Sequence, residues 1–310
     1  MPPDLYPTPT QVDAWCERVL ASADAVSVKV TPLPASPYDF RMGVWHGGAD
    51  SRYLAFSSRK TGTFYGYWQT VTSGGPAPTL IHLPGYGAEM SAHPELVAAG
   101  YNVLHVSPLG YATPQGPDDA RRGADGNWPV LPDTALSGGK RGYAAWLRDA
   151  VVAANWLRAQ PQVQPDRLGT FGTSQGGGGA LLLGSLLRER GCRAVAADQP
   201  FLTGFRLMAA HEQPGAYGMV LPALAGLDQK QQAAAWRALG LIDTLSHAPR
   251  LTMPTLLTSG ARDDVCPAQT VEALFALLPG SRSYSQIAGQ AHGYNQYFVQ
   301  LARAWFGSFV

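Results

Sequence analysis

One serine in the 310-residue sequence lies in a pattern that suits nucleophilic attack. Gly172-Thr173-Ser174-Gln175-Gly176 matches G-x-S-x-G, a pattern that presents a serine on a sharp turn between a strand and a helix. The pattern alone is weak evidence in a glycine-rich chain. The flanking residues strengthen it, because an apolar run at 168–171 can form the strand before the turn and another at 180–187 can form the helix after it. We therefore predict that Ser174 is a nucleophile.

The same glycines allow a second interpretation, a loop that cradles phosphate groups. A phosphate loop of the Walker kind ends in Gly-Lys-Ser/Thr, whereas residues 177–180 are Gly-Gly-Gly-Ala. A strained turn explains the glycines better, because small residues two positions before and after the serine avoid a clash with it. The helix N-terminus that follows also offers free N–H groups to a developing negative charge. The turn is therefore the preferred interpretation.

A serine nucleophile needs a base, and three histidines follow it in the chain: His211, His247 and His292. His211 and His247 lie in an irregular helical stretch, where a solvated or capping role is expected. His292 lies in a loop of small residues, 288–293, between the last expected strand and the last expected helix. That loop presents the base in chains with the order serine, acid, histidine. We predict that His292 is the base.

Two adjacent aspartates compete for the acid that orients the base. Asp263 and Asp264 both follow an apolar strand and precede Cys266-Pro267, where the next helix is expected to begin. In segments of this kind the first aspartate usually turns inward, so we predict Asp263. The alternative for Asp264 is a solvated acid or a charge at the helix N-terminus. Cys266 is a poor candidate nucleophile, because no second histidine is available to serve it.

Stabilising the oxyanion of an acyl-transfer reaction requires two N–H groups. The first is expected from Gln175, which follows the nucleophile. The second is expected from the loop after an earlier strand, and Leu83-Pro84-Gly85-Tyr86-Gly87 is such a loop. We predict the N–H of Tyr86, while an ordinary glycine-rich turn is the alternative for this stretch.

From residue 78 onward, strands and helices are expected to alternate. The pattern predicts strands at 79–83, 101–106, 168–172, 193–197, 254–258 and 283–287, and helices at 90–99, 143–159, 176–190 and 294–306, with a Gly/Pro-rich loop at 107–139. Strands that alternate with helices of this length predict a mostly parallel, doubly wound sheet. The fold class expected is therefore α/β, and specifically the α/β-hydrolase fold.

Two further segments complete a single domain spanning 1–310. Residues 1–75 are expected to form an N-terminal helix at 10–22 and an antiparallel meander of strands at 25–30, 52–57 and 63–72. The aromatic residues of the last strand suit core packing better than a substrate platform. Residues 203–248 interrupt the alternation with a helical insertion, expected either as a lid over the site or as a helical excursion beside the sheet.

Charge and cysteine usage restrict the possible partners. The net charge is +1, from 23 basic and 22 acidic residues, so no clustered positive excess favours nucleic acid. The three cysteines, Cys16, Cys192 and Cys266, share no disulfide or zinc spacing and are expected to be reduced thiols. No metal-ligand spacing or cofactor motif is recognised. Without a leader pattern or a long apolar run, a cytoplasmic protein that does not contact membranes is expected.

Residues 140–300 resemble the acetyl xylan esterase/cephalosporin-C deacetylase family of α/β-hydrolases. The similar segments are the helix before the nucleophile strand, the nucleophile turn, the segment after the next strand, and the acid loop with its approach. They span Arg141–Leu157, Asp166–Gly178, Ala197–Leu202 and Asp243–Pro267. The resemblance supports Asp263 over Asp264 as the acid.

The resemblance implies deacetylation of small carbohydrate esters and related acetates, often by a homohexamer. The sequence departs from the family at two places. Ser107-Pro108-Leu109-Gly110-Tyr111 stands where the family carries Arg-Gly-Gln, and Gly293 stands where the family carries Glu after the histidine. Both departures leave the residues of the hydrolase core in place. They affect instead the two expectations taken from the family, the specificity for acetylated sugars and the homohexamer.

The function expected is hydrolysis of a small carboxylic ester through an acyl-enzyme. His292 would take the proton of Ser174, and Asp263 would hold the imidazole in the required tautomer. The alternatives are a serine peptidase or amidase on the same fold, and a binding protein that has lost catalysis. Peptidases of this fold usually add a propeller, for which the chain is too short. A complete set of serine, histidine and aspartate argues against the binding protein.

Overall fold

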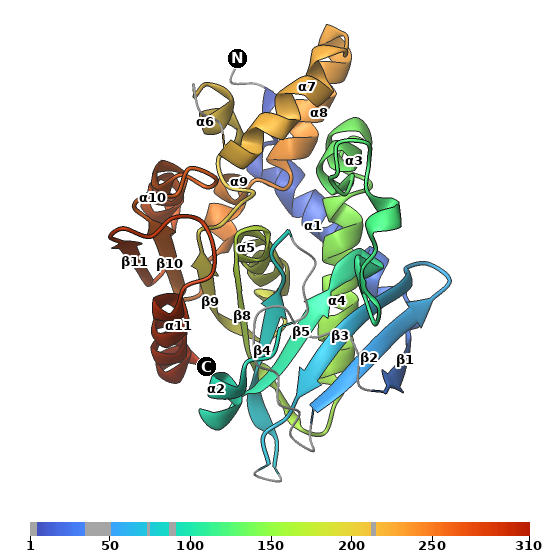
Figure 1. The fold of residues 1–310 in the computed structure, drawn as a ribbon, viewed down its shortest axis with the longest axis vertical. Coiled ribbons are helices and arrows are strands. Elements are labelled where there is room, and N and C mark those ends of the chain that lie inside the picture. Colours follow the sequence, from blue (N-terminus) through green and yellow to red (C-terminus); the bar gives the residue numbers. More distant parts are fainter. Residues whose placement is uncertain (1–4, 35–50, 73–74, 87–90, 212–214) are drawn as a thin grey trace.

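The computed structural model describes residues 5–34, 51–72, 75–86, 91–211 and 215–310. Its main sheet has nine strands in the order β1-β2-β3-β5-β4-β8-β9-β10-β11 (Figure 1). They are Lys29–Leu33 (β1), Ser51–Ser58 (β2), Gly62–Gln69 (β3), Ala77–Leu83 (β4), Asn102–Ser107 (β5), Val163–Thr173 (β8), Cys192–Asp198 (β9), Thr255–Gly260 (β10) and Arg282–Ile287 (β11). A separate two-stranded hairpin joins Ala112–Thr113 (β6) to Gly116–Pro117 (β7).

The sheet is antiparallel at its N-terminal edge and parallel elsewhere. β1, β2, β3 and β5 pair antiparallel in that order, and every pairing from β5 through β4 to β11 is parallel. All residues of β5 and β10 are buried, as expected for central strands covered on both faces. The predicted α/β-hydrolase architecture, with an antiparallel N-terminal portion, is therefore confirmed.

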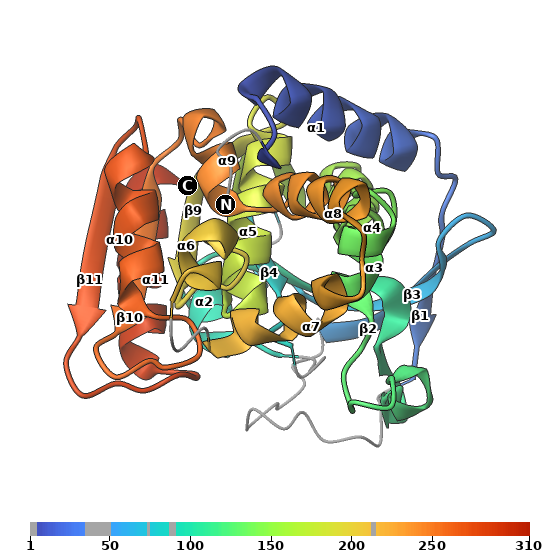
Figure 2. The same cartoon turned by 90° about the horizontal axis from the view of Figure 1, so that it is seen from above.

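Helices cover both faces of the sheet. They are Pro9–Asp24 (α1), Pro94–Ala98 (α2), Val130–Leu136 (α3), Tyr143–Arg158 (α4), Gln175–Leu187 (α5), Phe205–Ala209 (α6), Val220–Ala225 (α7), Gln229–Gly240 (α8), Thr244–His247 (α9), Ala268–Leu277 (α10) and Gln296–Phe309 (α11). Seen from above, α1 runs along the outside of the helical layer that contains α4 and α5 (Figure 2). Among the helices described, none is long and apolar enough to cross a membrane.

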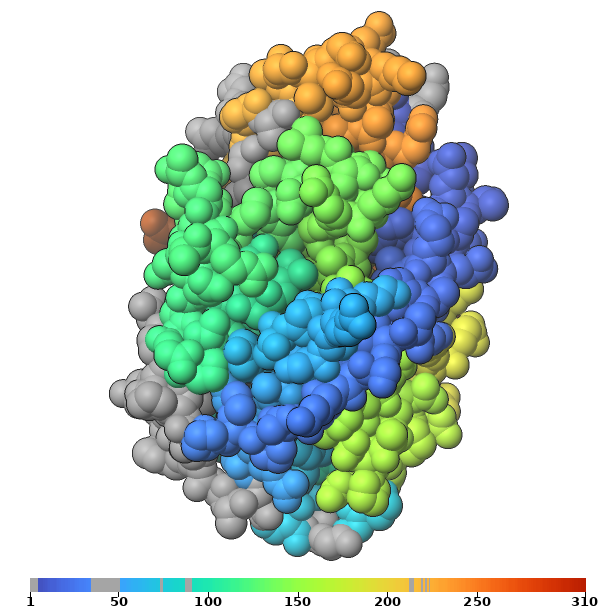
Figure 3. Space-filling view, turned by 90° about the vertical axis from the view of Figure 1, so that its right-hand side faces the viewer, coloured from blue at the N-terminus to red at the C-terminus, as the bar shows by residue number. Residues whose placement is uncertain are grey.

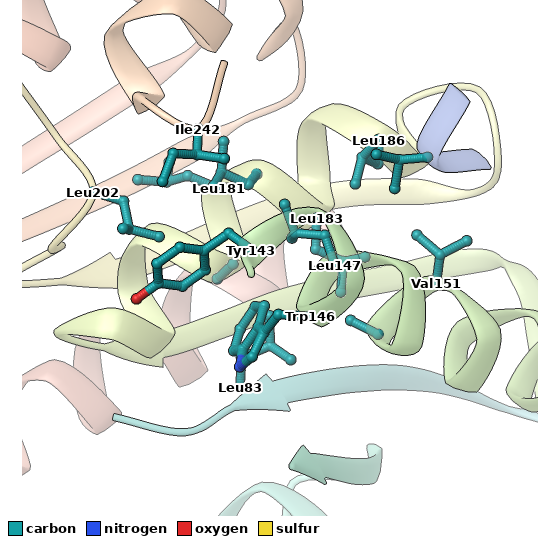
Figure 4. Close-up of a cluster of buried hydrophobic side chains, with 14 of the residues drawn as sticks. Leu83, Tyr143, Trp146, Leu147, Val151, Leu181, Leu183, Leu186, Leu202 and Ile242 are labelled. Atoms are coloured by element: carbon teal, nitrogen blue, oxygen red, sulfur yellow. The ribbon is translucent and has the colours of Figure 1, made fainter. Parts of the chain in front are cut away.

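The larger core lies between the sheet and helices α4 and α5 (Figure 4). Its centre combines aliphatic side chains of α5 with large side chains of α4, among them Tyr143 and Trp146, both fully buried. A Cβ at Gly179 would lie 2.5 Å from the Trp146 ring, and a Cβ at Gly178 would collide with the Phe201 carbonyl oxygen. The glycines after the nucleophile therefore let α5 approach its neighbours closely, and fix the helix directly behind Ser174.

The opposite face has a smaller core formed with α2 and α11. Leu80, Val103 and Phe171 of three adjacent strands pack there with Phe298 and Phe306 of α11. The aromatic residues of β3 pack instead in the larger core. Their rings stack on or meet the aromatic rings of β2 and α4. This agrees with the interpretation of the aromatic strand as core.

Three local predictions need correction. The strand predicted at Ala25–Val30 begins only at Lys29, because Ala25 still closes the last turn of α1 by donating its N–H to the Ala21 carbonyl. The helix predicted at 90–99 is the short α2, which begins at Pro94; residue 90 lies outside the described residues. The loop predicted at 107–139 contains α3, whose proline lies in the first turn, where a missing N–H is tolerated.

The insertion at 203–248 forms α6 to α9 and packs at one end of the helical layer. α8 lies against α3, and α9 contacts α1, α5 and α10. Asp243 anchors the insertion, because its carboxylate accepts hydrogen bonds from the N–H groups of Gly204 and Phe205 and from the Tyr6 hydroxyl. The N-terminal elements (blue) form another side of the molecule, beside the green segment that includes α3 (Figure 3).

Candidate active site

Ser174 lies at the turn between β8 and α5, as the sequence predicted. Its φ of 58° is in the left-handed region, which is unfavourable for a residue with a side chain. Two backbone hydrogen bonds hold this conformation: Ser174 donates to the Asp198 carbonyl and accepts from Phe201, both at 2.9 Å. A Cβ at Gly176 would collide with the Leu83 carbonyl. Only glycine at that position lets the turn lie against β4.

His292 connects the serine to an acid. Its Nε2 lies 2.9 Å from the Ser174 Oγ, and its Nδ1 lies 2.9 Å from the Asp263 Oδ2. The structure therefore brings together the three residues predicted as a triad, although 118 residues separate the serine from the histidine. These distances suit proton transfer from the hydroxyl to the imidazole.

The structure distinguishes the two candidate aspartates. The Asp263 side chain is fully buried, whereas Asp264 is exposed. The second oxygen of Asp263, Oδ1, accepts hydrogen bonds from the N–H groups of Val265 and Cys266, at 2.9 and 2.8 Å. These bonds fix the orientation of the carboxylate, so that Oδ2 points at the imidazole. The geometry agrees with the choice of Asp263.

Gln199, to which the sequence analysis gave no role, holds the histidine loop. Its side-chain carbonyl accepts from the Gly293 N–H at 2.8 Å, and its amide donates to the Ala291 carbonyl at 3.0 Å. These two bonds clamp the backbone on both sides of His292. Gln199 itself has a positive φ of 44°, and no sequence signal marks that conformation. The sequence offers only the position of Gln199 directly after β9, at the edge of the sheet where the site residues are expected.

Asp198, the last residue of β9, ties together the segments that carry the site. Its buried carboxylate accepts from Thr173, Thr258 and Asn295, which lie next to the nucleophile, on β10 and at the start of α11. Burial raises the pKa of Asp198 to about 6, while these hydrogen bonds and the nearby His292 oppose the rise. Asp198 does not touch the serine hydroxyl or the imidazole in any hydrogen bond described, so its role is to position them.

The two residues predicted for the oxyanion hole are held as neighbours. The Gln175 side-chain amide donates to the Gly85 carbonyl at 3.4 Å, and its carbonyl accepts from the Tyr143 hydroxyl at 2.8 Å. The Tyr86 hydroxyl donates to the Trp128 carbonyl at 2.8 Å. The Gly85–Tyr86 stretch, which carries the Tyr86 N–H, is thereby held beside the helix N-terminus. Gly87, at the end of the predicted loop, lies outside the described residues.

A cavity of about 500 Å³ contains Ser174 and His292. Its wall comes from the ends of β4 and β8, the approach to α2, and the start of α11. The other lining residues are His82, Pro84, Gly85, Tyr86, Ser91, Ala92, His93, Pro94, Glu95, Phe171, Thr173, Gly293, Tyr294, Phe298 and Val299. Among these described lining residues none belongs to the insertion at 203–248. The described part of this segment, for which a lid was one of the two alternatives, therefore does not line the cavity.

The other cysteine and histidine side chains considered from the sequence take no part in the two contacts that link Ser174, His292 and Asp263. Burial raises the pKa of the Cys266 thiol well above its usual range, and Asp263 adds to that rise, so the thiol stays protonated. His247 is buried, which corrects the expectation of a solvated or capping role. Its ring bonds to the Ser185 hydroxyl and the Leu241 carbonyl, and burial lowers its pKa to about 4. His211 is exposed. All three cysteines are free and buried.

Comparison with known proteins gives a consistent result. The model of the acetyl xylan esterase family matches residues 47–308. The uncharacterized protein YfhR of Escherichia coli is 30% identical over 227 residues, covering 70% of this chain and 65% of its own. Acetyl xylan esterase 1 from a Thermoanaerobacterium species superposes with a TM-score of 0.79 at 22% identity, covering 97% of this chain and 94% of its own. An acetyl xylan esterase from a Paenibacillus species gives 0.77 at 20% identity over both whole chains.

Proposed function

The chain belongs to the acetyl xylan esterase family and is a carboxylic ester hydrolase, and from this we propose that it cleaves small acetyl esters through an acyl-enzyme on Ser174. One observation carries the proposal. Ser174, His292 and Asp263 are linked by two contacts of 2.9 Å, and Ser174 and His292 line one cavity. This linked arrangement is what nucleophilic attack by a serine requires.

The first half of the reaction forms the acyl-enzyme. The Ser174 Oγ attacks the carbonyl carbon of the ester while its proton passes to the His292 Nε2. The carbonyl oxygen becomes an oxyanion, which the N–H groups of Gln175 and Tyr86 stabilise. The C–O bond to the alcohol then breaks, and the alcohol leaves with the proton that His292 carries.

The second half releases the acid. A water molecule gives a proton to His292 and attacks the acyl carbon, and the Ser174 Oγ leaves with that proton. Asp263 accepts the hydrogen bond from Nδ1 throughout and stabilises the positive imidazolium. The buried, doubly hydrogen-bonded carboxylate is suited to this role, because it needs no reorganisation during the reaction.

The family and the cavity support a small acyl group on a larger alcohol. A volume of about 500 Å³ is within the range of pockets that enclose ligands of drug size, and exceeds what acetate alone would fill. Phe171, Phe298 and Val299 supply apolar side chains to the cavity wall, whereas Ser91 and Glu95 supply polar groups for an alcohol rich in hydroxyls. Small carbohydrate acetates fit this description.

A substrate panel tests the proposal. We expect kcat/KM on p-nitrophenyl acetate or propionate to exceed that on the octanoate, and acetanilides of the same leaving-group size to react far more slowly. A rise in kcat/KM with chain length would contradict the short-chain preference. Amides cleaved as fast as esters would favour the alternative, a peptidase or amidase.

A further inference from the structure

Three histidines gather outside the triad, and two of them, His82 and His93, line the cavity. His82 on β4 and His105 on β5 are direct partners in the parallel pairing of the two strands. His93 precedes the first turn of α2 and folds back onto the same place, its ring centroid 4.3 Å from that of His82. One ring nitrogen from each lies within 4.8 Å of the others. Within the described parts of the chain, this is the one such group of potential metal ligands.

The ring nitrogens of His82 and His105 lie nearly as far apart as two nitrogens bound to one metal ion. The Nδ1 atoms of His82 and His105 lie 2.7 Å apart, so one ring donates a hydrogen bond to the other. Two imidazole nitrogens on one tetrahedral Zn²⁺, each about 2.05 Å from it, lie about 3.3 Å apart. A small rotation of the rings would therefore convert the hydrogen bond into two metal bonds. The donated proton moves to the Nε2 of its own ring, and no net proton is lost.

His93 supplies the observation that a hydrogen-bonded histidine pair does not explain. Its side chain is buried, and its Nε2 has no hydrogen-bond partner. A buried polar atom without a partner is costly and rare in folded proteins. The other nitrogen, Nδ1, lies 3.5 Å from the Glu95 carboxylate. Metal-bound histidines usually have this arrangement, in which a carboxylate holds one ring nitrogen and the other faces the metal.

The surroundings of the cluster favour a metal ion. All three rings are buried, and one nitrogen of each lies within 4.8 Å of the others. A cation that accepts electron pairs from the three rings would give the His93 Nε2 the partner that it lacks.

We propose that His82, His93 and His105 form a binding site for a divalent transition-metal ion of the Zn²⁺ type, in the wall of the active-site cavity. Three nitrogen ligands suit Zn²⁺ and leave one coordination position for water or a ligand oxygen. Because His82 and His93 line the cavity that contains Ser174, the ion would act on what that cavity holds. The proposal does not depend on the reaction proposed for the triad.

Metal binding by the purified full-length chain tests the site. Tag-free protein, freed of metal with a chelator and dialysed, is titrated with Zn²⁺ against a chromophoric chelator, and bound zinc is measured by elemental analysis. We expect one Zn²⁺ per chain in the wild type. Co²⁺ should bind in its place and give the intense visible absorption of a tetrahedral complex.

Three variants assign the ligands. His93→Ala should abolish stoichiometric binding, and Glu95→Gln, on a partly exposed side chain, should weaken it by about 10- to 100-fold. His211→Ala, the matched control on an exposed histidine, should bind as the wild type does. Glu95→Gln keeps the test decisive if His93→Ala fails to fold.

Three results would overturn the proposal. The wild type could bind no stoichiometric zinc, or its affinity could be unchanged in both His93→Ala and Glu95→Gln. Zinc binding could also be lost in His292→Ala and retained in His93→Ala, which would place the ion on the triad.

Discussion

One cavity is lined by His292 of the proposed triad and by His82 and His93 of the histidine cluster, yet the chain fixes the rings of these two groups in different ways. The His292 ring lies between a serine and a fully buried carboxylate that two backbone N–H groups hold in place. The His82 ring instead meets two other imidazoles and the Phe171 ring. A ring with a fixed acid behind it can accept and return a proton. A ring among other imidazoles is held neutral and offers an electron pair.

The largest effect that tests this contrast is expected at the nucleophile. Ser174→Ala should reduce ester hydrolysis by about 10⁴-fold or more, because the triad acts as a unit. Initial rates on p-nitrophenyl acetate measure the effect. The exposed Ser308→Ala is the matched control and should keep wild-type turnover. Retention of more than roughly a tenth of the activity in Ser174→Ala would exclude this serine as the nucleophile.

The next effect separates the two aspartates. Asp263→Asn should lower kcat by about 10²- to 10⁴-fold, because an amide can hold the imidazole in the wrong tautomer. Asp264→Asn changes an exposed side chain beside it and should have little effect. The two variants are compared under the same conditions, with circular dichroism to confirm folding. The opposite ranking would move the acid by one residue.

A smaller effect is expected where the histidine loop is held. Gln199→Met removes both bonds that clamp residues 291 and 293, so kcat should fall by about 10- to 100-fold through misplacement of His292, with KM little changed. Gln290→Met is the matched control, since Gln290 also donates to the Ala291 carbonyl, but in an exposed contact. A rise in KM with unchanged kcat in Gln199→Met would show that Gln199 acts on the substrate instead.

The smallest effect is expected for the imidazole of His82 and concerns the pH dependence of the reaction. Burial lowers the pKa of His82 well below its usual range, so the neutral ring persists on the acidic side of that range. In metal-free protein, His82→Asn should therefore leave the midpoint of the kcat/KM profile unchanged, whatever it does to the maximum. A shifted midpoint would show that His82 is charged in that range.

The three residues that the structure brings together could be selected from the sequence, because each of them lies in a recognisable local setting. Ser174 follows an apolar strand and precedes an apolar helix, and His292 lies in a loop of small residues before the last helix. The order of strands in a doubly wound sheet then places these loops at one edge. The parallel strands were predictable for the same reason, since their apolar runs are buried on both faces.

Residues whose roles depend on pairing across the sheet were not predictable. His82 and His105 meet because β4 and β5 pair in one particular register, and residues 82, 93 and 105 have no spacing of a known metal motif. The clamp by Gln199 depends on a positive φ and on two loops that meet only in the folded chain. The sequence left open whether 203–248 is a lid or a helical excursion, because contacts with α1, α3 and α5, which the described part of the segment makes, form only in the folded chain.

Covalent labelling tests the central claim, that Ser174 is the activated nucleophile, most directly. A fluorophosphonate forms a bond to the attacking oxygen with loss of fluoride, and peptide mapping by mass spectrometry locates the adduct. The structure predicts one adduct per chain, on the peptide that contains Ser174, and a much slower reaction in His292→Ala. An adduct on another residue, or equal labelling in the wild type and His292→Ala, would contradict the account.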